Sequence, residues 1–515
     1  MQPILSGFIE MKTVFVLLDS LNRKAMECYG GTYVKTPNFK RFSERAVTFD
    51  NHYVGSLPCI PARRDLHTGR LNFLHRSWGP LEPFDDSFPE LLKKAGTYSH
   101  IVTDHHHYFA DGGATYHQRY SSWELVRGQA IDRWKAHVNA DLDELKKDYH
   151  PIQHHRVNNM INRQYMGEEQ DYSGPQTFVL GQEFLEKNHT EDNWLLQLEC
   201  FDPHEPFHAP PRFSDMYPTS YDGPILDWPL YKQVEESPEE IAELRANYAA
   251  LTTMCDEYFG RLLNFFDEHD MWSDTCLILT TDHGFLLGEH DWWSKNRMPV
   301  YDEIAHIPLM IYHPDYAHEG GTRRASLTQT TDIMPTILSL YDHDIPPDVT
   351  GKSLIPMLKQ DAPVRDAVIF GYFGAACNVT DGRHVYHRYP ESLTADGLYE
   401  YTLMPTRMTS RMPISDLVGA TLADPFSFTK GASVLRLKPQ TDDDGEPVEV
   451  QGMNYADTVS RLYDLEKDPR QETPIKAPLK EAELVAAMIA LMREADAPAE
   501  LFTRFDLEPN GGNDA

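Results

Sequence analysis

The residues best suited to chemistry are the five from Cys59 to Arg63, which form a C-x-P-x-R element. A proline just inside this stretch favours the start of a helix, so Cys59 is expected at a helix N-terminus. The positive end of a helix and the nearby Arg63 would both lower the pKa of the thiol and make it a nucleophile. The plain alternative is a half-buried cysteine that precedes a proline-initiated helix.

Three apolar, β-rich runs end in residues that can bind metals or transfer protons. Such runs are typical of strands buried on both faces of a parallel sheet. In open α/β sheets, ligands bind at the carboxyl ends of the strands, so these polar residues are expected at one edge. The runs and the residues that follow them are Thr13–Leu18 with Asp19, Trp194–Phe201 with Asp202 and His204, and Thr275–Thr280 with Asp282 and His283.

The remaining pattern predicts two parts, an α/β catalytic domain over residues 1–363 and an α+β subdomain over 364–515. A capping box at Ser237 and Glu240 begins a long helix between the second and third runs. Residues 134–187 are polar and helix-prone, which indicates a helical insertion. After residue 363, short alternating segments predict a smaller antiparallel sheet, followed by a helix over Leu479–Ala495 and a disordered tail, EPNGGNDA.

Composition limits the partners and the compartment. The 79 acidic against 47 basic residues leave a net charge of −32, which disfavours nucleic acid and anionic membranes as partners. No apolar run reaches the length of about 18 residues that a spanning helix needs. The first apolar stretch ends at Asp19 and is expected to be a strand rather than a signal peptide. Six cysteines without paired spacing suggest reduced thiols, so we expect a cytoplasmic protein, with room for a homo-oligomer.

The chain resembles the sulfatase family, within the alkaline-phosphatase-like superfamily. The resemblance extends over nearly the whole chain, in family order. It is carried by VFVLLDS, CIPARRDLHTG, DPHEPF, LILTTDHGFLLGEH, SKNRMPVYDE, TDIMPTILSL and RLYDLEKDPRQE. It implies a large mixed, mostly parallel sheet flanked by helices, with a smaller C-terminal antiparallel-sheet subdomain.

The resemblance implies an unusual nucleophile. In this family the motif cysteine, here Cys59, is oxidised by a formylglycine-generating enzyme to an aldehyde that hydrates to a geminal diol. One hydroxyl attacks sulfur and expels the alcohol; the other then loses its proton, and collapse to the aldehyde ejects sulfate. A serine could not perform this last step.

The resemblance also implies one divalent metal, bound by Asp19, modified Cys59, Asp282 and His283. Calcium is the usual ion in the family, but the histidine would also accept manganese or zinc. The commonest family pattern has a second aspartate where this chain has Ser20, and an asparagine where it has His283. Both departures resemble the phosphonate monoester and phosphodiester hydrolases of the same superfamily.

Five further residues match family positions around the transferred group. Arg63 and Lys295 are expected to bind the anion, and Lys295 can assist the leaving group. His204 is the expected general acid, and His107 the base that regenerates formylglycine. His105 stands where the family has a lysine and is expected to contact substrate; this histidine cluster could instead be a second metal site or a polar loop.

Three hypotheses follow. The first is hydrolysis of a small sulfate ester to alcohol and sulfate by an arylsulfatase-like enzyme. The second is phosphonate monoester or phosphodiester hydrolysis with the same nucleophile. The third is a catalytically silent metal- or anion-binding protein in which Cys59 stays a thiol.

Overall fold

The computed structural model describes residues 11–295, 299–441 and 458–507. Its centre is a nine-stranded mixed sheet in the order β12-β2-β11-β8-β1-β6-β4-β5, with β13 also paired to β2. The strands are β1 (Lys12–Leu18), β2 (Val47–Tyr53), β4 (Tyr98–Thr103), β5 (Ser122–Leu125), β6 (Trp194–Cys200), β8 (Thr275–Thr281), β11 (His306–Tyr312), β12 (Arg323–Arg324) and β13 (Thr328–Gln329). The three predicted apolar runs are thus β1, β6 and β8.

These three strands lie side by side and run parallel, β1 between β6 and β8. The register sets Leu18 opposite both Cys200 and Thr281, so the three strands end at the same level. Asp19, Asp202 and Asp282 therefore emerge at one edge of the sheet. Among the strands of this sheet that the structure describes, β11 alone runs antiparallel to its neighbours.

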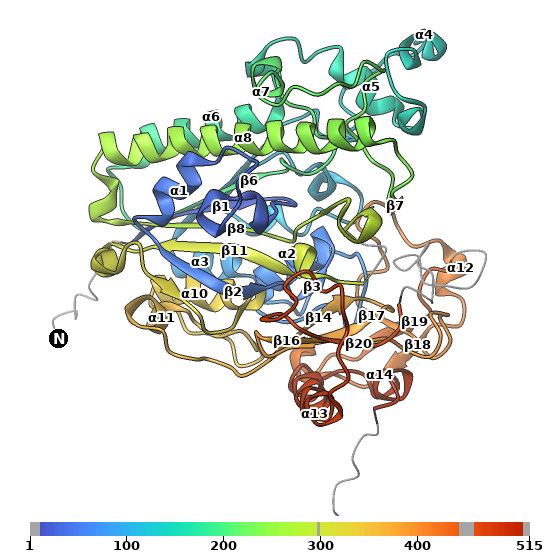
Figure 1. Ribbon diagram of the computed structural model, residues 1–515. Coiled ribbons are helices and arrows are strands. Elements are labelled where there is room, and N and C mark those ends of the chain that lie inside the picture. The colour runs from blue at the N-terminus through green and yellow to red at the C-terminus, as the bar shows by residue number, and fades with distance from the viewer. Residues whose placement is uncertain (1–10, 296–298, 442–457, 508–515) are drawn as a thin grey trace, which may run out of the picture.

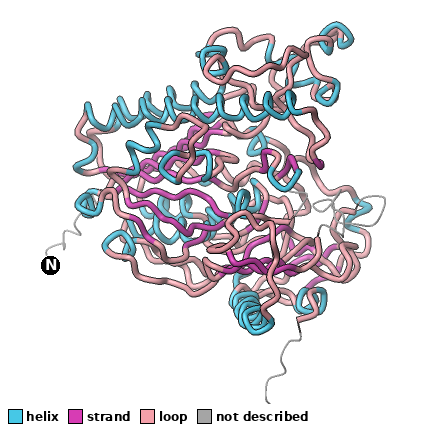
Figure 2. The backbone as a smooth tube through the Cα atoms, viewed as in Figure 1, coloured by secondary structure: helices cyan, strands magenta, loops and turns pink. Residues whose placement is uncertain are grey.

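Helices cover both faces of the sheet (Figure 1; Figure 2). Val14, Val16 and Leu18 of β1 face one hydrophobic core with the long helix α8, whereas Phe15 and Leu17 face another with α2 and α10. This alternation buries β1 on both sides, as its continuous apolar sequence predicts. The covering helices are α1 (Pro37–Ser43), α2 (Cys59–Thr68), α3 (Phe88–Ala95), α6 (Ser173–Asn188), α8 (Pro238–Glu268), α10 (Ile333–Leu340) and α11 (Ile355–Lys359).

The predicted capping box of α8 is confirmed, because Ser237 and Glu240 hydrogen-bond each other's backbone N–H. The predicted insertion, residues 134–187, contains the short helices α4 (Leu142–Lys146) and α5 (Val157–Arg163), but also most of α6, which packs on β6 of the main sheet. Its status as a separate insertion stays a prediction. Two further short helices are α7 (Pro211–Ser214) and α9 (Asp302–Ala305), and a small sheet joins β7 (Lys232–Gln233), β9 (Leu286–Leu287) and β10 (Trp292–Ser294).

The C-terminal part forms two smaller sheets that are antiparallel, as the sequence predicts, apart from the parallel pairing of the short strand β3 with β14. One has the order β20-β16-β15-β14-β3 and the other β17-β19-β18. Their elements are β3 (Ser56–Leu57), β14 (Val368–Tyr372), β15 (Cys377–Thr380), β16 (His384–Arg388), β17 (Glu400–Thr402), β18 (Thr421–Ala423), β19 (Val434–Leu437) and β20 (Arg461–Asp464), with helices α12 (Ile414–Leu417), α13 (Pro478–Glu494) and α14 (Ala499–Arg504). The two residues of β3 directly precede the Cys59 motif, so this sheet helps to place it.

The proposed division at residue 363 falls between α11 and β14 and stays a prediction. The tail EPNGGNDA lies outside the described residues. Within the described ranges, no helix combines the length and the apolar character needed to cross a membrane. All six cysteines are unbridged.

Candidate active site

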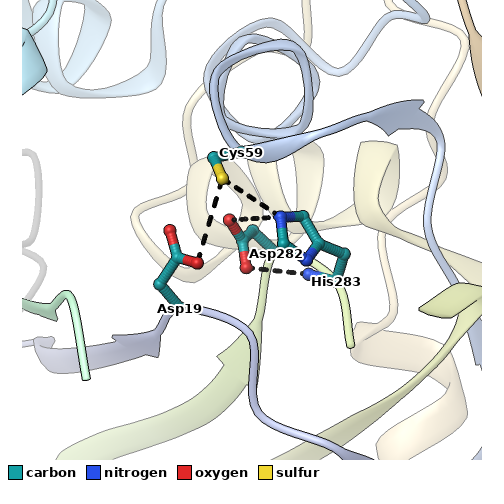
Figure 3. Close-up of side chains that lie close together, drawn as sticks. All are labelled: Asp19, Cys59, Asp282 and His283. Atoms are coloured by element: carbon teal, nitrogen blue, oxygen red, sulfur yellow. Dashed lines mark hydrogen bonds and ion pairs between the residues drawn. The ribbon is translucent and has the colours of Figure 1, made fainter. Parts of the chain in front are cut away.

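Four residues from three segments converge at the carboxyl edge of the main sheet. Asp19 follows β1, Cys59 is the first residue of α2, and Asp282 and His283 follow β8. Figure 3 shows their side chains pointing toward one another. One ligand atom from each lies within 4.8 Å of the others, and all four side chains are buried.

The histidine presents its ligating nitrogen to the cysteine. His283 Nδ1 lies 2.8 Å from the Gly284 carbonyl oxygen, which can only accept, so Nδ1 carries the proton. The other ring nitrogen, His283 Nε2, lies 3.2 Å from Cys59 Sγ and 3.4 Å from Asp282 Oδ2. Cys59 Sγ also lies 3.9 Å from Asp19 Oδ1. An oxygen of modified residue 59 would occupy the position of this sulfur.

Arg63, one helical turn after Cys59, forms ion pairs with three carboxylates of the site. Its Nε donates to Glu199 Oε1 at 2.6 Å, Nη1 to Asp282 Oδ2 at 2.5 Å, and Nη2 lies 2.9 Å from Asp19 Oδ2. The guanidinium thus meets three buried carboxylates and fixes the two candidate aspartate ligands. Its predicted contact with the anion stays a prediction.

Ser20 takes a distinct role at the family's second aspartate position. Its Oγ donates to Asp19 Oδ1 at 2.7 Å, and its backbone N–H donates to Asp282 Oδ1 at 3.0 Å. Ser20 makes these bonds from the left-handed region of the backbone, with φ at 60°. Ser20 therefore orients two carboxylates instead of adding a third.

The expected thiolate at Cys59 is wrong. Burial, followed by the charge of Asp19, raises the pKa of the thiol well above its ordinary value. Position at a helix N-terminus and the Arg63 charge do not outweigh these two effects. As a cysteine, residue 59 is a neutral thiol at neutral pH.

A cationic group borders the nucleophile. Lys295 is buried; burial opposes its charge, whereas the carboxylates of Glu205 and Asp19 favour it. Its Nζ lies 3.4 Å from both carboxylate oxygens of Glu205. Lys295 is therefore a fixed positive charge beside Cys59.

His204 is neutral and oriented. Burial lowers the pKa of His204 to about 4, against the raising effect of Glu205. Its Nδ1 donates to the Glu205 carbonyl oxygen at 2.5 Å, which leaves Nε2 unengaged by that bond. To act as the predicted general acid, His204 must gain its proton when the substrate anion is present.

The predicted histidine cluster lies beside His204. The ring centroids of His105 and His107 are 5.3 Å apart, and Phe201 contacts both His105 and His204. Burial lowers the pKa of His105 and of His107 well below the ordinary value, so both are neutral bases. Within the described residues, neither of the two side-chain groups that could hold a metal contains any of these three histidines. Their individual roles stay predictions.

Sequence reasoning missed two buried glutamates. Glu199 of β6 accepts hydrogen bonds from Arg63 and from the Tyr108 hydroxyl, at 2.6 and 3.2 Å. Glu205 accepts a hydrogen bond from the Tyr231 hydroxyl, and its carboxylate balances the positive charge of Lys295. The signal for Glu199 was a lone acid within the apolar run WLLQLECF, where an unpaired charge would be costly.

The ligand set fits a divalent cation. Asp19, Asp282 and Glu199 place three buried carboxylates around one guanidinium, that of Arg63, so negative charge exceeds positive when all three ionise. Burial and the neighbouring Asp19 raise the pKa of Asp282, which reflects this repulsion. Two carboxylates and an imidazole nitrogen, joined by an oxygen if residue 59 is modified, would suit Ca²⁺, Mn²⁺ or Zn²⁺.

A second buried acidic pair lies beyond the strand ends. Ligand atoms of Asp104, Cys200 and Asp202 lie within 4.8 Å of one another. Burial raises the pKa of Asp104 to about 7, and burial together with Asp104 raises the pKa of Asp202 well above its ordinary value. The two carboxyl groups therefore retain protons at pH values where exposed aspartates are ionised.

This pair predicts a stability that falls as the pH rises. Between about pH 4 and pH 7 the folded chain holds more protons than the unfolded chain, so the free energy of unfolding decreases through that window, by on the order of 2–4 kcal/mol for Asp104. Asp104→Asn mimics the protonated form and should flatten the decrease. Urea unfolding at pH 5 and pH 8 measures it; the exposed Asp222→Asn is the control, and equal slopes in all three proteins would contradict the assignment.

Comparison with known proteins decides the family. The profile of the sulfatase family matches residues 12–343, which include every candidate site residue described above. This chain belongs to the sulfatase family. The predicted enzyme class, sulfuric ester hydrolase, is confirmed at this level.

Among its relatives, the sulfatase is similar to the N-acetylglucosamine-6-O-sulfatase of Bacteroides thetaiotaomicron, with 24% identity over 429 residues, 72% of this chain and 75% of the relative. A solved structure in complex with its substrate D-glucosamine-2-N,6-O-disulfate superposes with a TM-score of 0.65 at 17% identity, covering 95% of this chain and 99% of that chain. The phosphonate monoester hydrolase of Agrobacterium radiobacter gives a TM-score of 0.62 at 18% identity, covering 94% and 96%. These structural neighbours confirm the predicted alkaline-phosphatase-like fold.

Proposed function

We propose that this sulfatase hydrolyses a small sulfate ester to an alcohol and inorganic sulfate, with formylglycine at residue 59 as its nucleophile. The observation that carries the proposal is the convergence of Cys59 with Asp19, Asp282 and His283 beside the fixed charge of Lys295. The neutral, buried thiol supports the modification, because an unmodified Cys59 would be a poor nucleophile. A formylglycine-generating enzyme is the partner that the proposal requires.

Asp19, Asp282, His283 and residue 59 would hold one divalent metal, Ca²⁺ by family, with Mn²⁺ or Zn²⁺ compatible with the histidine. When bound, such an ion polarises an oxygen ligand and neutralises negative charge. Arg63 and Ser20 keep the two aspartates in place. Residues of the chain itself thus hold the two aspartates in the arrangement that a metal would need.

Lys295 and His204 serve the departing alcohol in this proposal. Lys295 stabilises the anionic group and the growing charge on the leaving oxygen, because its own charge is permanent. His204, held through Nδ1 by the Glu205 carbonyl, presents Nε2 and delivers a proton once the sulfate charge has raised its basicity. His107 is the proposed base of the second half-reaction, consistent with its neutral state.

Phosphonate monoester or phosphodiester hydrolysis is the second candidate. Two observations favour it: His283 presents Nε2 to residue 59, and Ser20 bonds to the aspartate ligands in place of a second acid. The third candidate, a silent binding protein, requires the unmodified thiol. The cytoplasmic location and the oligomeric state remain predictions.

Parallel assays of the mature protein on aryl esters with the same phenol test the function. We expect kcat/KM for the sulfate ester to exceed that for the phosphonate monoester. A strong preference for the phosphonate would overturn the first candidate in favour of the second. Metal-loaded protein that carries formylglycine and hydrolyses neither ester would contradict both.

A further inference from the structure

Arg156, directly before α5, is a positioned arginine without an acidic partner. Its guanidinium carbon lies 4.3 Å from the centroid of the Trp228 ring, and its Nε is buried without a hydrogen-bond partner. Within residues 11–295, 299–441 and 458–507, no carboxylate lies within ion-pair distance of it. Arg127 and Arg163 of the same segment are instead paired, with Asp132 and Asp227.

A short chain of contacts links Arg156 to the active site. Trp228 shares a buried apolar cluster with Phe201. The Phe201 ring lies 4.0 Å from the ring of His204, the proposed acid for the leaving alcohol. Arg156 therefore lies on the His204 side of the site, where the proposed mechanism protonates the leaving alcohol.

Glu205, the carboxylate of the site whose charge acts on Arg156, is already engaged by other groups. Glu205 already accepts from the Tyr231 hydroxyl and meets Lys295 and His204. Burial lowers the pKa of Arg156, and the carboxylate of Glu205, which forms no ion pair with it, opposes this effect only in part. A half-buried guanidinium in this state gains most from a ligand that brings its own negative charge.

We propose that Arg156 binds a second anionic group, a carboxylate or a second sulfate, on the alcohol half of the substrate. This inference rests on the proposed sulfate-ester hydrolysis and specifies its substrate class. The planar guanidinium offers two parallel N–H donors to either oxyanion, and the Trp228 face holds it in orientation. Arg156 is thus a specificity-determining residue rather than a group that acts on the reacting atoms.

The test compares three substrates: a monosulfated hexosamine, the same hexosamine with a second sulfate, and a monosulfated hexuronic acid. We expect the wild-type protein to prefer at least one dianionic substrate, and Arg156→Gln to lower that preference by about 10- to 100-fold, chiefly through KM. The dianionic substrate whose kcat/KM falls more in Arg156→Gln identifies whether Arg156 binds a carboxylate or a second sulfate. Arg156→Lys should retain part of the preference, since it keeps the charge but not the two-pronged contact.

Arg133→Gln is the matched control, because it removes the same charge from an exposed side chain of the same segment. It should leave the preference at its wild-type value. An equal loss on all three substrates in Arg156→Gln, or a wild-type protein without a dianion preference, would overturn the inference. Wild-type protein inactive on every sulfate ester would overturn the proposed function itself.

Discussion

Replacement of Cys59 with alanine is expected to lower kcat/KM for a sulfate ester by on the order of 10⁴-fold or more. Residue 59 is the only candidate nucleophile among the four converging ligands, and alanine removes both its attacking atom and its contribution to the metal. Steady-state kinetics on an aryl sulfate measures the loss. Its size distinguishes a nucleophile from a residue that merely lines the site.

Cys276→Ala is the matched control, because Cys276 is equally buried, in β8, but its side chain faces the core formed with α2 and α10. This variant should lose some stability while its turnover stays near that of the wild type. Cys59→Ser should release at most one equivalent of alcohol per enzyme, since a serine ester cannot collapse to an aldehyde. Sustained turnover by either Cys59 variant would contradict the assignment.

Arg63→Lys is expected to weaken metal binding by about 10- to 100-fold and to destabilise the fold by about 3–5 kcal/mol. The guanidinium reaches Glu199, Asp282 and Asp19 through three different nitrogens. A single ammonium cannot span all three positions, so at least one buried carboxylate loses its partner. Metal titration by calorimetry and urea unfolding measure the two effects separately.

Arg64→Lys provides the comparison within the same helix. Arg64 is also buried and bonds Asp85 and Asn72, away from the ligand set. Replacement of Arg64 should destabilise the protein without lowering its affinity for the metal. If Arg63→Lys bound metal as tightly as the wild type, the role of Arg63 in holding Asp19 and Asp282 would be refuted.

Much of the site could be predicted because its residues follow strong local patterns. Asp19 and Asp282 each end a continuous apolar strand, and the equal register of β1, β6 and β8 brings such ends together. The start of α8 could be predicted from an equally local signal, since a capping box depends on two residues that are three positions apart. These features need no knowledge of distant contacts.

The features that escaped prediction depend on tertiary burial. The pKa of Cys59 rises because desolvation outweighs the lowering effect of the helix N-terminus. Desolvation depends on the tertiary fold and cannot be read from the residues next to Cys59 in the sequence. The role of Glu199 as a partner of Arg63 depends on the fold, because the two residues are 136 positions apart in the sequence. The strand β3 has two residues and pairs with β14, a length too short to carry a sequence signature.

Mass spectrometry of the peptide that contains residue 59 tests the central claim most directly. It should be applied to protein co-produced with a formylglycine-generating enzyme, together with the rate of sulfate-ester hydrolysis of the same sample. We predict that the peptide has the mass of the aldehyde or its hydrate, and that activity rises in proportion to that fraction. Full activity in protein whose residue 59 is entirely a thiol would contradict the account.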